Sequence, residues 1–538
     1  GACSWLPCKR SAGKALQMTS PCDPLDRLFA DLGDTFGALP AISDGRALSL
    51  SYTDLARVAA ETRNALRALG LARQDRLAVV LPQSVPAILA WIGAASALTT
   101  LPFRSRTTAF EAADLMARAG VRAVLVPLDG AEAAREAAAG LALPVLDYAW
   151  NGALRRLDLS GPALGPAAPD QPAAPHDLAV LYTTSGTTGR PRIVPRIHRA
   201  STDTMRASII DSALGPGART LLIPPATTPF GQTEFLFSCS IGALTIVAGQ
   251  IDPSGVEDMV TRFDVDWITL TPAHIAFWTR QRAETPLPRL PRLRWVACGA
   301  GSLTDQLRAA AEAALGVPVL NLFGSSENLR VSLERIPRDL AEGTAGWPIT
   351  EVRVVEDNGT DAAPGAVGIL LVRGPSVFSG YLDDPEATAR AFTPDGWQIT
   401  GDRAILHPDG SLSVLGRDSD LIDRGGDKID PAEVEAVLLA HPGVADCAVF
   451  AVPDASYGHA PAAAVHLAPD AAVTIRDLRR WLLDHLAPHK APRQIVLTGP
   501  LPRTATGKIR RAALADLLPA PPSPTSHPTR GRAAEPPT

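Results

Sequence analysis

The stretch DLAVLYTTSGTTGRPR, residues 177–192, joins an apolar run to a loop rich in hydroxyls and glycine. Residues 177–183 predict a short buried strand. The residues that follow carry hydroxyls and unobstructed backbone N–H groups, which can surround an anion. The G-x-x-x-x-G-K-[ST] pattern of a P-loop NTPase is not present. A Ser/Thr/Gly-rich surface loop is the alternative, and the position after a strand of a parallel sheet favours a ligand-binding loop.

Outward from this stretch, short apolar runs alternate with segments of helical periodicity. Helices are predicted over 53–69 and 85–98. Strands are predicted over 75–82, 121–127, 177–183, 218–224, 242–248, 265–272, 293–299 and 318–324. This alternation predicts an α/β fold, with a large N-terminal domain of doubly wound mixed sheets. A Pro/Ala-rich connector over 160–177 divides the two sets of strands.

After about residue 350 the sequence pattern changes to short predicted strands separated by Gly/Asp turns. This pattern predicts an antiparallel or β-barrel-like subdomain. A small α+β domain is predicted to follow, with helices over 431–441 and 475–486. The predicted boundaries are a tail over 1–22, the N-terminal domain over 23–417, the C-terminal domain over 418–517 and a disordered tail over 518–538. The first 17 residues lack the apolar core of a signal peptide and are expected to be an extended start or an added segment.

The composition narrows the function classes. The net charge of −5 provides neither a basic field for nucleic acid nor a polybasic membrane patch, so neither partner is expected. No apolar run reaches the roughly 18 residues of a transmembrane helix. Cys239, Cys298 and Cys447 lie in apolar surroundings, which predicts buried free thiols and a reducing, cytoplasmic location.

The stretch YTTSGTTGRPR, residues 182–192, resembles the phosphate-binding signature of the acyl-adenylate-forming enzymes, which include acyl-CoA synthetases, stand-alone adenylation domains and luciferases. Four further stretches agree with the family in its order: NLFGSSE (321–327), TGD (400–402), GRDSDLIDRGGDKIDPAEVE (416–435) and PRTATGKIRR (502–511). The resemblance spans about residues 26–517. It implies a ligase that uses ATP, Mg²⁺ and coenzyme A. A carboxylate attacks the α-phosphorus of ATP, pyrophosphate leaves, and a thiol then attacks the acyl-adenylate.

The resemblance implies a nucleotide site on the large domain. Its expected residues are Thr183, Thr184, Ser185, Gly186, Thr187, Thr188, Gly189, Arg192, Gly299, Ala300, Gly301, Ser302, Phe323, Gly324, Ser325, Asp402 and Arg417. The loop from Thr183 would hold the leaving pyrophosphate, and Asp402 with Arg417 would hold the ribose. Glu327 is the expected Mg²⁺ ligand, because Mg²⁺ takes one or two carboxylates beside phosphate oxygens. Ser326 stands where the family usually has threonine and is expected at the α-phosphate.

The small domain is implied to rotate about a hinge at Asp418 between the two half-reactions. Lys508 is the expected catalytic residue of adenylation, bridging carboxylate and α-phosphate oxygens. Only five of the 51 basic residues are lysines, so a lysine flanked by arginines indicates a site that arginine does not serve. Gly425, Gly426 and Lys428 are expected on the coenzyme A side.

Three departures from the family bear on the reaction. Arg192 stands where relatives typically have lysine, and Asp423 reverses a common positive charge. Thr228 replaces a histidine or aromatic residue that commonly closes the acyl pocket. The expected pocket residues are Thr228, Phe230, Gly231, Phe235 and Ser332. This set predicts a bulky, mostly hydrophobic acid, and the Ala/Arg/Pro-rich composition suggests secondary metabolism such as antibiotic biosynthesis.

Several alternatives remain open at the level of sequence. The enzyme could perform mainly the thioesterification half-reaction on a supplied acyl-adenylate, or it could load a carrier protein. An α-amino acid substrate is disfavoured, because Gly231 follows Phe230 where amino-acid adenylation domains have an aspartate that holds the substrate's α-ammonium group. The nearby carboxylate of Glu234 means that an amino acid is not excluded. A non-catalytic acyl- or nucleotide-binding regulatory module is the alternative from another class, and it predicts damaged motifs.

Overall fold

The computed structural model describes residues 24–105, 107–184, 191–208, 214–249, 251, 253–284, 290–301, 303–336, 343–417, 422–424, 427–429, 431–454, 458–469, 471–503 and 509–518. The chain divides into two compact units, one up to residue 419 and one from residue 420 on. The predicted site residues outside the described ranges are Ser185, Gly186, Thr187, Thr188, Gly189, Ser302, Asp418, Gly425, Gly426 and Lys508. The tails 1–22 and 519–538 also lie outside them, and the side chains of Asp423 and Lys428 are not described.

The first sheet of the first unit contains the strand predicted over 177–183. Its described strands, in spatial order, are β7 (Arg156–Ser160), β6 (Val145–Asn151), β5 (Ala123–Pro127), β3 (Arg76–Val80), β4 (Thr99–Phe103), β8 (Leu178–Thr183) and β9 (Ile193–Ile197). The five strands from β6 to β8 are parallel, and the edge strands β7 and β9 pair antiparallel. The sheet is therefore mixed, as predicted.

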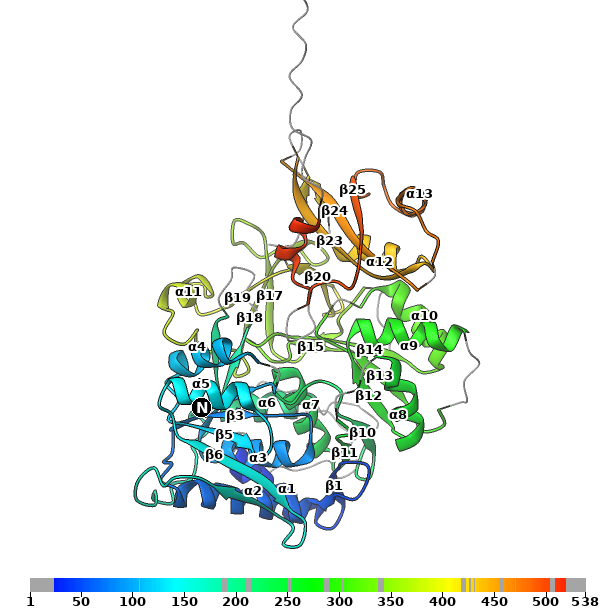
Figure 1. The fold of residues 1–538 in the computed structure, drawn as a ribbon. Helices are drawn as coiled ribbons and strands as arrows, with labels where there is room; N and C mark the ends of the chain where they lie inside the picture. The colour runs from blue at the N-terminus through cyan, green and yellow to red at the C-terminus, as the bar shows by residue number, and fades with distance from the viewer. Residues whose placement is uncertain are drawn as a thin grey trace, which may run out of the picture. The chain divides into compact units, whose positions relative to one another are not determined.

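Side chains alternate between the two faces of this sheet, as the period of a strand requires. In β3, Leu77 and Val79 pack into one apolar cluster, whereas Ala78 and Val80 pack into another. Helices cover both faces. They are α1 (Leu25–Phe36), α2 (Tyr52–Ala68) and α3 (Val85–Ala95) on one face and α4 (Ala109–Ala119) and α5 (Glu132–Gly140) on the other (Figure 1). This is the doubly wound arrangement that the sequence predicts.

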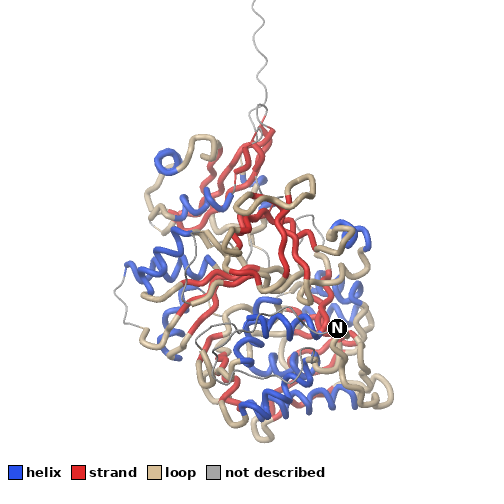
Figure 2. Tube along the Cα trace, turned by 180° about the vertical axis from the view of Figure 1, so that it is seen from behind, coloured by secondary structure: helices blue, strands red, loops and turns tan. Residues whose placement is uncertain are grey.

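A second sheet repeats the pattern. Its described strands, in spatial order, are β16 (Trp347–Pro348), β15 (Ser332–Leu333), β14 (Val319–Phe323), β13 (Trp295–Cys298), β12 (Trp267–Leu270), β10 (Arg219–Leu221), β11 (Leu244–Ile246), β1 (Pro40–Ser43) and β2 (Ser49–Ser51). In this order, the strands from β14 to β1 pair parallel with one another, and β15, β16 and β2 pair antiparallel. Its helices are α7 (Pro229–Ser240), α8 (Val256–Phe263), α9 (Pro272–Glu284) and α10 (Asp305–Leu315), whereas α6 (His198–Ser208) packs in the same apolar cluster as β8 and β9 of the first sheet. Seen from behind, helices flank the strands of this unit on both sides (Figure 2).

The segment after residue 350 forms an antiparallel sheet, one of the two arrangements predicted for it. The order is β17 (Glu351–Val355), β18 (Val367–Arg373), β19 (Gln398–Leu406) and β20 (Leu412–Arg417), with α11 (Pro385–Arg390) between the second and third strands. This sheet belongs to the first unit.

The second unit has a sheet and a core of its own. Its described elements are β21 (Ile422–Arg424), β22 (Asp427–Ile429), α12 (Pro431–Leu439), β23 (Val444–Asp454), β24 (Gly458–Leu467), α13 (Ile475–His485), β25 (Gln494–Thr498) and short 3₁₀ turns over Arg511–Ala513 and Ala515–Leu517. Helices α12 and α13 pack on one face, where Val434 and Leu478 meet Val449. None of the described helices in either unit combines the length and the apolar composition that a membrane span requires.

Candidate active site

Strands β8 and β9 form the stem of the predicted phosphate loop. Thr183 pairs with Ile193 in the ladder, and the backbone N–H of Thr184 donates to the carbonyl of Arg192 at 2.9 Å. Tyr182 lies just before the loop and is fully buried, and its hydroxyl donates to the side-chain oxygen of Gln232 on α7. The stem therefore connects the loop to the predicted acyl-pocket segment.

Glu327 lies in a tight turn after β14. The backbone N–H of Ser325 donates to Asn328 Oδ1 at 2.8 Å, and the N–H of Glu327 donates to Ser325 Oγ at 3.1 Å. Gly324 permits the turn, because a Cβ there would lie 1.7 Å from the carbonyl oxygen of Leu329. Ser326 lies in the same turn, next to Glu327. The predicted acidic residue is thus held on a rigid backbone at the carboxyl end of a parallel strand.

Two residues that the sequence analysis does not identify hold Glu327. The hydroxyl of Tyr381 donates to Glu327 Oε1 at 3.0 Å, and Arg196 Nη1 donates to the Glu327 carbonyl at 2.7 Å. Burial, reinforced by the neighbouring Glu327 charge, raises the pKa of Tyr381 to about 12, so this hydroxyl stays protonated. Burial lowers the pKa of Arg196 to about 10, which still leaves the guanidinium charged at neutral pH. Among the described residues, none bonds the second carboxylate oxygen of Glu327.

Arg192, the departure from the family at the end of the phosphate loop, is engaged by the same neighbourhood. Its guanidinium lies over the ring of Tyr381, 5.1 Å from the centroid, and its Nε is 3.8 Å from the carboxylate of Asp384. A planar guanidinium stacks on an aromatic ring better than an ammonium does. The arginine therefore has a local structural partner.

The structure brings Asp402 and Arg417 together. They are directly opposite each other on β19 and β20, and Arg417 Nε lies 3.1 Å from Asp402 Oδ1. Arg417 also donates to the carbonyl of Thr400 at 2.7 Å, while Thr400 Oγ1 accepts from the N–H of Asp402 at 3.0 Å. Asp402 is 5% exposed and Arg417 about half exposed. The predicted ribose pair is thus built on a rigid ladder.

Gly299, Ala300 and Gly301 follow β13, next to the Glu327 turn that follows β14. A Cβ on Gly299 would lie 2.7 Å from the Phe230 ring, and one on Gly301 would lie 3.1 Å from the Pro272 ring. Ala300 adopts a positive φ of 61°. Packing therefore explains the two glycines without a nucleotide, and the predicted acyl residue Phe230 lies against the predicted adenine-site residue Gly299.

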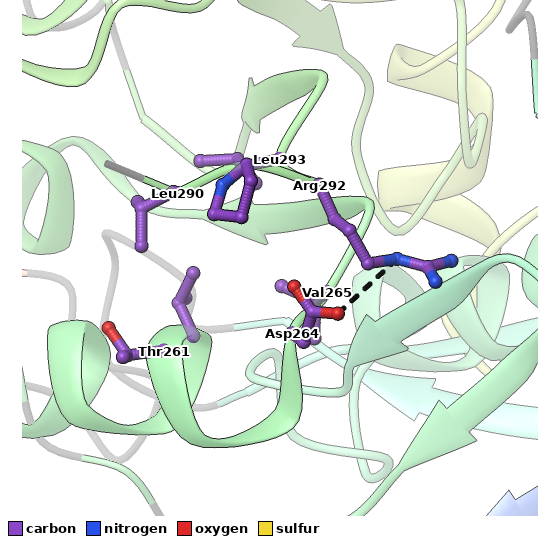
Figure 3. Close-up of a pocket in the computed structure, with 8 residues that line it drawn as sticks. Thr261, Asp264, Val265, Leu290, Arg292 and Leu293 are labelled. Carbon is purple, nitrogen blue, oxygen red and sulfur yellow. Dashed lines mark ion pairs between the residues drawn. The ribbon is translucent and has the colours of Figure 1, made fainter. Parts of the chain in front are cut away.

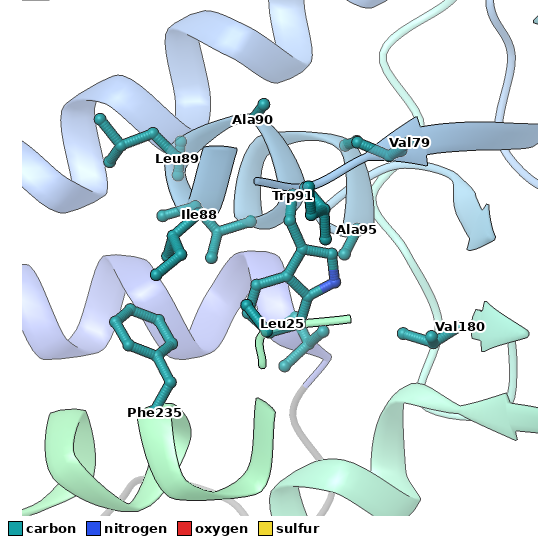
Figure 4. Close-up of a cluster of buried hydrophobic side chains, with 14 of the residues drawn as sticks. Leu25, Val79, Ile88, Leu89, Ala90, Trp91, Ala95, Val180 and Phe235 are labelled. Atoms are coloured by element: carbon teal, nitrogen blue, oxygen red, sulfur yellow. The ribbon is translucent and has the colours of Figure 1, made fainter. Parts of the chain in front are cut away.

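The predicted acyl-pocket residues lie in different environments. Thr228 is the N-cap of α7, where its hydroxyl accepts from the N–H of Gly231 at 3.1 Å and donates to the Pro225 carbonyl at 2.8 Å. Gly231 packs on the same backbone, since a Cβ would lie 2.2 Å from the Pro225 carbonyl oxygen. Phe235 lies in the core, with its ring 6.2 Å from Trp91 of α3 in an edge-to-face arrangement (Figure 4).

Ser332 is fully buried on β15, directly opposite Phe323 of β14. Its hydroxyl has no hydrogen-bond partner among the described residues, and neither does the buried hydroxyl of Thr227 beside Thr228. Buried hydroxyls usually have a partner. These two are therefore groups that a bound molecule could satisfy.

A buried ion pair joins α7 to the Glu327 turn. Arg330 bonds Glu234 through Nη2 and Oε1, and Thr269 Oγ1 donates to Glu234 Oε2 at 2.6 Å. Glu234 is therefore occupied and is not a free carboxylate for a substrate ammonium. No local pattern distinguishes Arg330 from the many surface arginines of this chain. A cavity of about 40 Å³ lies beside the pair. Its lining includes Ser208, Glu234, Phe237, Trp295, Ala297, Leu320, Leu322, Arg330 and Leu333.

A second cavity of about 40 Å³ lies between α8 and residues 290–293 and shares no residue with the predicted site. Its polar groups are Thr261 and the pair Arg292–Asp264, whose Nε and Oδ2 are 3.8 Å apart (Figure 3). Arg292 also bonds Asp266 at 2.7 Å. The charged side chains that line this cavity are therefore paired with each other.

Comparison with known proteins identifies the family. A model of AMP-binding enzymes matches residues 31–382, and a model of their C-terminal domain matches residues 433–508. A probable CoA ligase of Humulus lupulus is 30% identical over 499 residues, which cover 89% of this chain and 94% of that protein. A 2-hydroxy-7-methoxy-5-methyl-1-naphthoate–CoA ligase of Streptomyces carzinostaticus is 33% identical over 402 residues, 73% of this chain and 67% of that protein. The crystal structure of ATP-bound MatB from Rhodopseudomonas palustris superimposes with a TM-score of 0.79 at 25% identity, covering 92% of this chain and 99% of that one. The chain belongs to the AMP-binding enzymes, in the acyl-CoA synthetase branch of the adenylate-forming superfamily, and is an AMP-forming acid–thiol ligase.

Proposed function

We propose that this ligase converts a bulky, mostly hydrophobic aromatic acid to its coenzyme A thioester through an acyl-adenylate. The observation that carries the proposal is the buried pair of Arg330 with Glu234 on α7, the helix that also carries the predicted acyl-pocket residues Phe230 and Phe235. Aromatic side chains suit an aromatic ring, and a buried charged pair that involves the same helix suits a hydrogen-bonding substituent on that ring. The unpaired hydroxyls of Thr227 and Ser332 offer further partners. The Streptomyces relative named for a hydroxylated naphthoate supports this acid class.

The described residues support a division of roles within the nucleotide site. Thr183, Thr184 and Arg192, with residues 185–189, would hold the leaving pyrophosphate, and Ser326 would contact the α-phosphate. Asp402 and Arg417 would hold the ribose, and residues 299–302 would flank the adenine. Two observations support this division of roles. Asp402 pairs with Arg417, and the backbone of Thr184 is hydrogen-bonded to that of Arg192 at the base of the loop.

Glu327 fits a Mg²⁺ ion. Its carboxylate is oriented through one oxygen by Tyr381, and the described residues leave the other oxygen unbonded. One carboxylate is enough for an ion whose remaining ligands are phosphate oxygens and water. When bound, the ion would neutralise phosphate charge during adenylation.

The remaining groups would come from the second unit and the end of the first. In the second unit, Lys508 would act in adenylation, and Gly425, Gly426 and Lys428 would line the coenzyme A side. Asp418, near the end of the first unit, would be the hinge. Coenzyme A is the proposed thiol, and loading of a carrier protein is the alternative. The buried free thiols Cys239, Cys298 and Cys447 support a reducing, cytoplasmic compartment, and the Ala/Arg/Pro-rich composition supports a place in secondary metabolism such as antibiotic biosynthesis.

One observation supports a second candidate function, that of an enzyme that mainly converts a supplied acyl-adenylate to its thioester. Arg192 is engaged by the Tyr381 ring and by the carboxylate of Asp384. A cation committed to these partners would stabilise pyrophosphate less than a mobile lysine would.

A panel of acids tests both candidates. Acetate, octanoate, benzoate, salicylate and 2-hydroxy-1-naphthoate are each incubated with ATP and Mg²⁺, with and without coenzyme A. Mass spectrometry then measures adenylate and thioester separately, and ATP–pyrophosphate exchange measures the first step. We expect the hydroxylated aromatic acids to react fastest. A preference for acetate or octanoate would contradict the proposed acid class. Thioester formed from synthetic adenylates, without exchange for any acid, would favour the second candidate.

A further inference from the structure

The segment 376–384 crosses from the Glu327 turn to the stem of the phosphate loop. The backbone N–H of Phe378 donates to the Glu327 carbonyl at 2.8 Å. Four residues later, the N–H of Leu382 donates to the carbonyl of Ile193, the first residue of β9, at 3.0 Å. The same short segment is thus bonded at one end to the predicted Mg²⁺ ligand and at the other to the loop.

Tyr381 lies between these two attachments and contacts both sides. Its hydroxyl donates to Glu327 Oε1 at 3.0 Å, and the guanidinium of Arg192 covers one face of its ring. Phe378 packs edge-on against the ring, with centroids 4.9 Å apart, and the Tyr381 N–H donates to Thr388 Oγ1 at 2.9 Å. A side chain fixed at its backbone, ring and hydroxyl holds its acceptor in one orientation.

Arg196 holds the backbone of the same residue. It is 1% exposed, and its two terminal nitrogens donate to the carbonyls of Glu327 and Ser376, while its Nε has no hydrogen-bond partner among the described residues. Burying a charged guanidinium away from water costs free energy, even when carbonyl groups accept its hydrogen bonds. Arg196 lies on β9, which follows directly on Arg192 at the end of the predicted phosphate loop, and both arginine side chains contact the surroundings of Glu327.

We propose that Tyr381 is a positioning residue for adenylation: it orients the Glu327 carboxylate toward the metal–phosphate site and couples that orientation to the phosphate loop through Arg192. This inference rests on the proposed role of Glu327. A hydrogen bond to one carboxylate oxygen directs the other toward the ion. The stacked guanidinium makes this orientation dependent on the position of Arg192, at the end of the stem. Residues that orient a metal ligand commonly matter about 10- to 100-fold for metal affinity or activity.

The test compares full-length wild type with Y381F, which keeps the ring and its packing and removes only the donor. Binding of a fluorescent N-methylanthraniloyl ATP analogue is titrated with MgCl₂, a readout that needs no acid substrate. We expect Y381F to need about 10-fold more Mg²⁺ for half-maximal binding. We also expect slower ATP–pyrophosphate exchange with the best acid of the panel. Thioester formation from the synthetic adenylate of that acid should match wild type.

Two further variants serve as controls. Y148F is the matched control, because the buried Tyr148 hydroxyl donates to the Val80 carbonyl at 2.9 Å in the core, and it should leave the Mg²⁺ titration unchanged. E327Q should weaken the Mg²⁺ response at least as much as Y381F. If E327Q responds normally, the metal role of Glu327 fails and the inference fails with it. If E327Q is impaired and Y381F matches Y148F, the inference alone is overturned. Equal slowing of both half-reactions in Y381F would also overturn it, since that indicates a general structural defect.

Discussion

At the scale of single residues, the Glu234–Arg330 pair is the feature that we propose restricts the acid most. Both side chains are less than 10% exposed, and Thr269 supplies a further bond to the carboxylate. A buried pair contributes little net stability compared with well-packed apolar residues, whereas removing one partner leaves a buried charge uncompensated. The free-energy cost of burying the two charges is understandable if the pair also selects the substrate.

The first prediction separates these two contributions. E234Q leaves Arg330 without a counter-charge and should lower the free energy of unfolding by about 3 to 5 kcal/mol. The double variant E234L/R330M removes both charges at similar volume and should recover most of that loss. Urea unfolding followed by tryptophan fluorescence measures both. The double variant should nevertheless prefer unsubstituted benzoate to salicylate. E234Q with wild-type stability would show that Arg330 has another compensating partner.

At the scale of elements, α1 depends on a residue far away in sequence. Its N-cap is Pro24, which supplies no side-chain cap, and the N–H of Leu25 instead donates to His198 Nδ1 at 3.3 Å. His198 begins α6 and is 1% exposed. To accept this bond the imidazole must be neutral, with its proton on Nε2. Burial lowers the pKa of His198 to about 4.

The second prediction concerns pH. Because the folded-state pKa of His198 lies below its ordinary value, the unfolded state binds a proton between these values that the folded state does not, so stability falls as pH falls from about 6.5 to 4. The full effect is roughly 3 kcal/mol. H198N keeps an acceptor but does not titrate, so its urea midpoint should change less over this range. Asp177, whose pKa is held at about 2 by hydrogen bonds from Arg73, contributes only at lower pH. Identical pH slopes for H198N and wild type would contradict the prediction.

Elements were predictable from sequence where one local pattern specifies them. Strands β3 and β5 are short apolar runs, and α2 has helical periodicity with a capping box at Ser51 and Asp54. Strand β9 carries Pro195 and Arg196 and shows no such pattern; its pairing with β8 defines it. The same limit applies to the site. The motifs point to Glu327 and to Asp402 with Arg417, whereas Tyr381, Arg196 and Arg330 act through long-range contacts that leave no local signal.

At the scale of the whole molecule, the two units have separate cores. Residues such as Val434, Leu478 and Val449 form the core of the second unit without any member from the first. The described site residues Glu327, Asp402 and Arg417 all belong to the first unit, whereas Lys508 belongs to the second. With the proposed roles of these residues, adenylation would require a group from each unit, and thioesterification need not use the same pair.

The last prediction follows from this division. K508A should slow ATP–pyrophosphate exchange by about 100-fold or more, because a charge placed on the reacting oxygens is lost. Thioester formation from a synthetic adenylate should be nearly unchanged. K508R should stay close to K508A if the site needs a compact ammonium, the reason inferred for a lysine in a chain that otherwise uses arginine. The control is K490A. Lys490 lies 2.6 Å from Glu433 within the second unit, and its loss should change either rate by no more than about 2-fold. Full exchange in K508R would mean that charge alone suffices. Equal slowing of both steps in K508A would mean that Lys508 serves the fold of its unit and not one half-reaction.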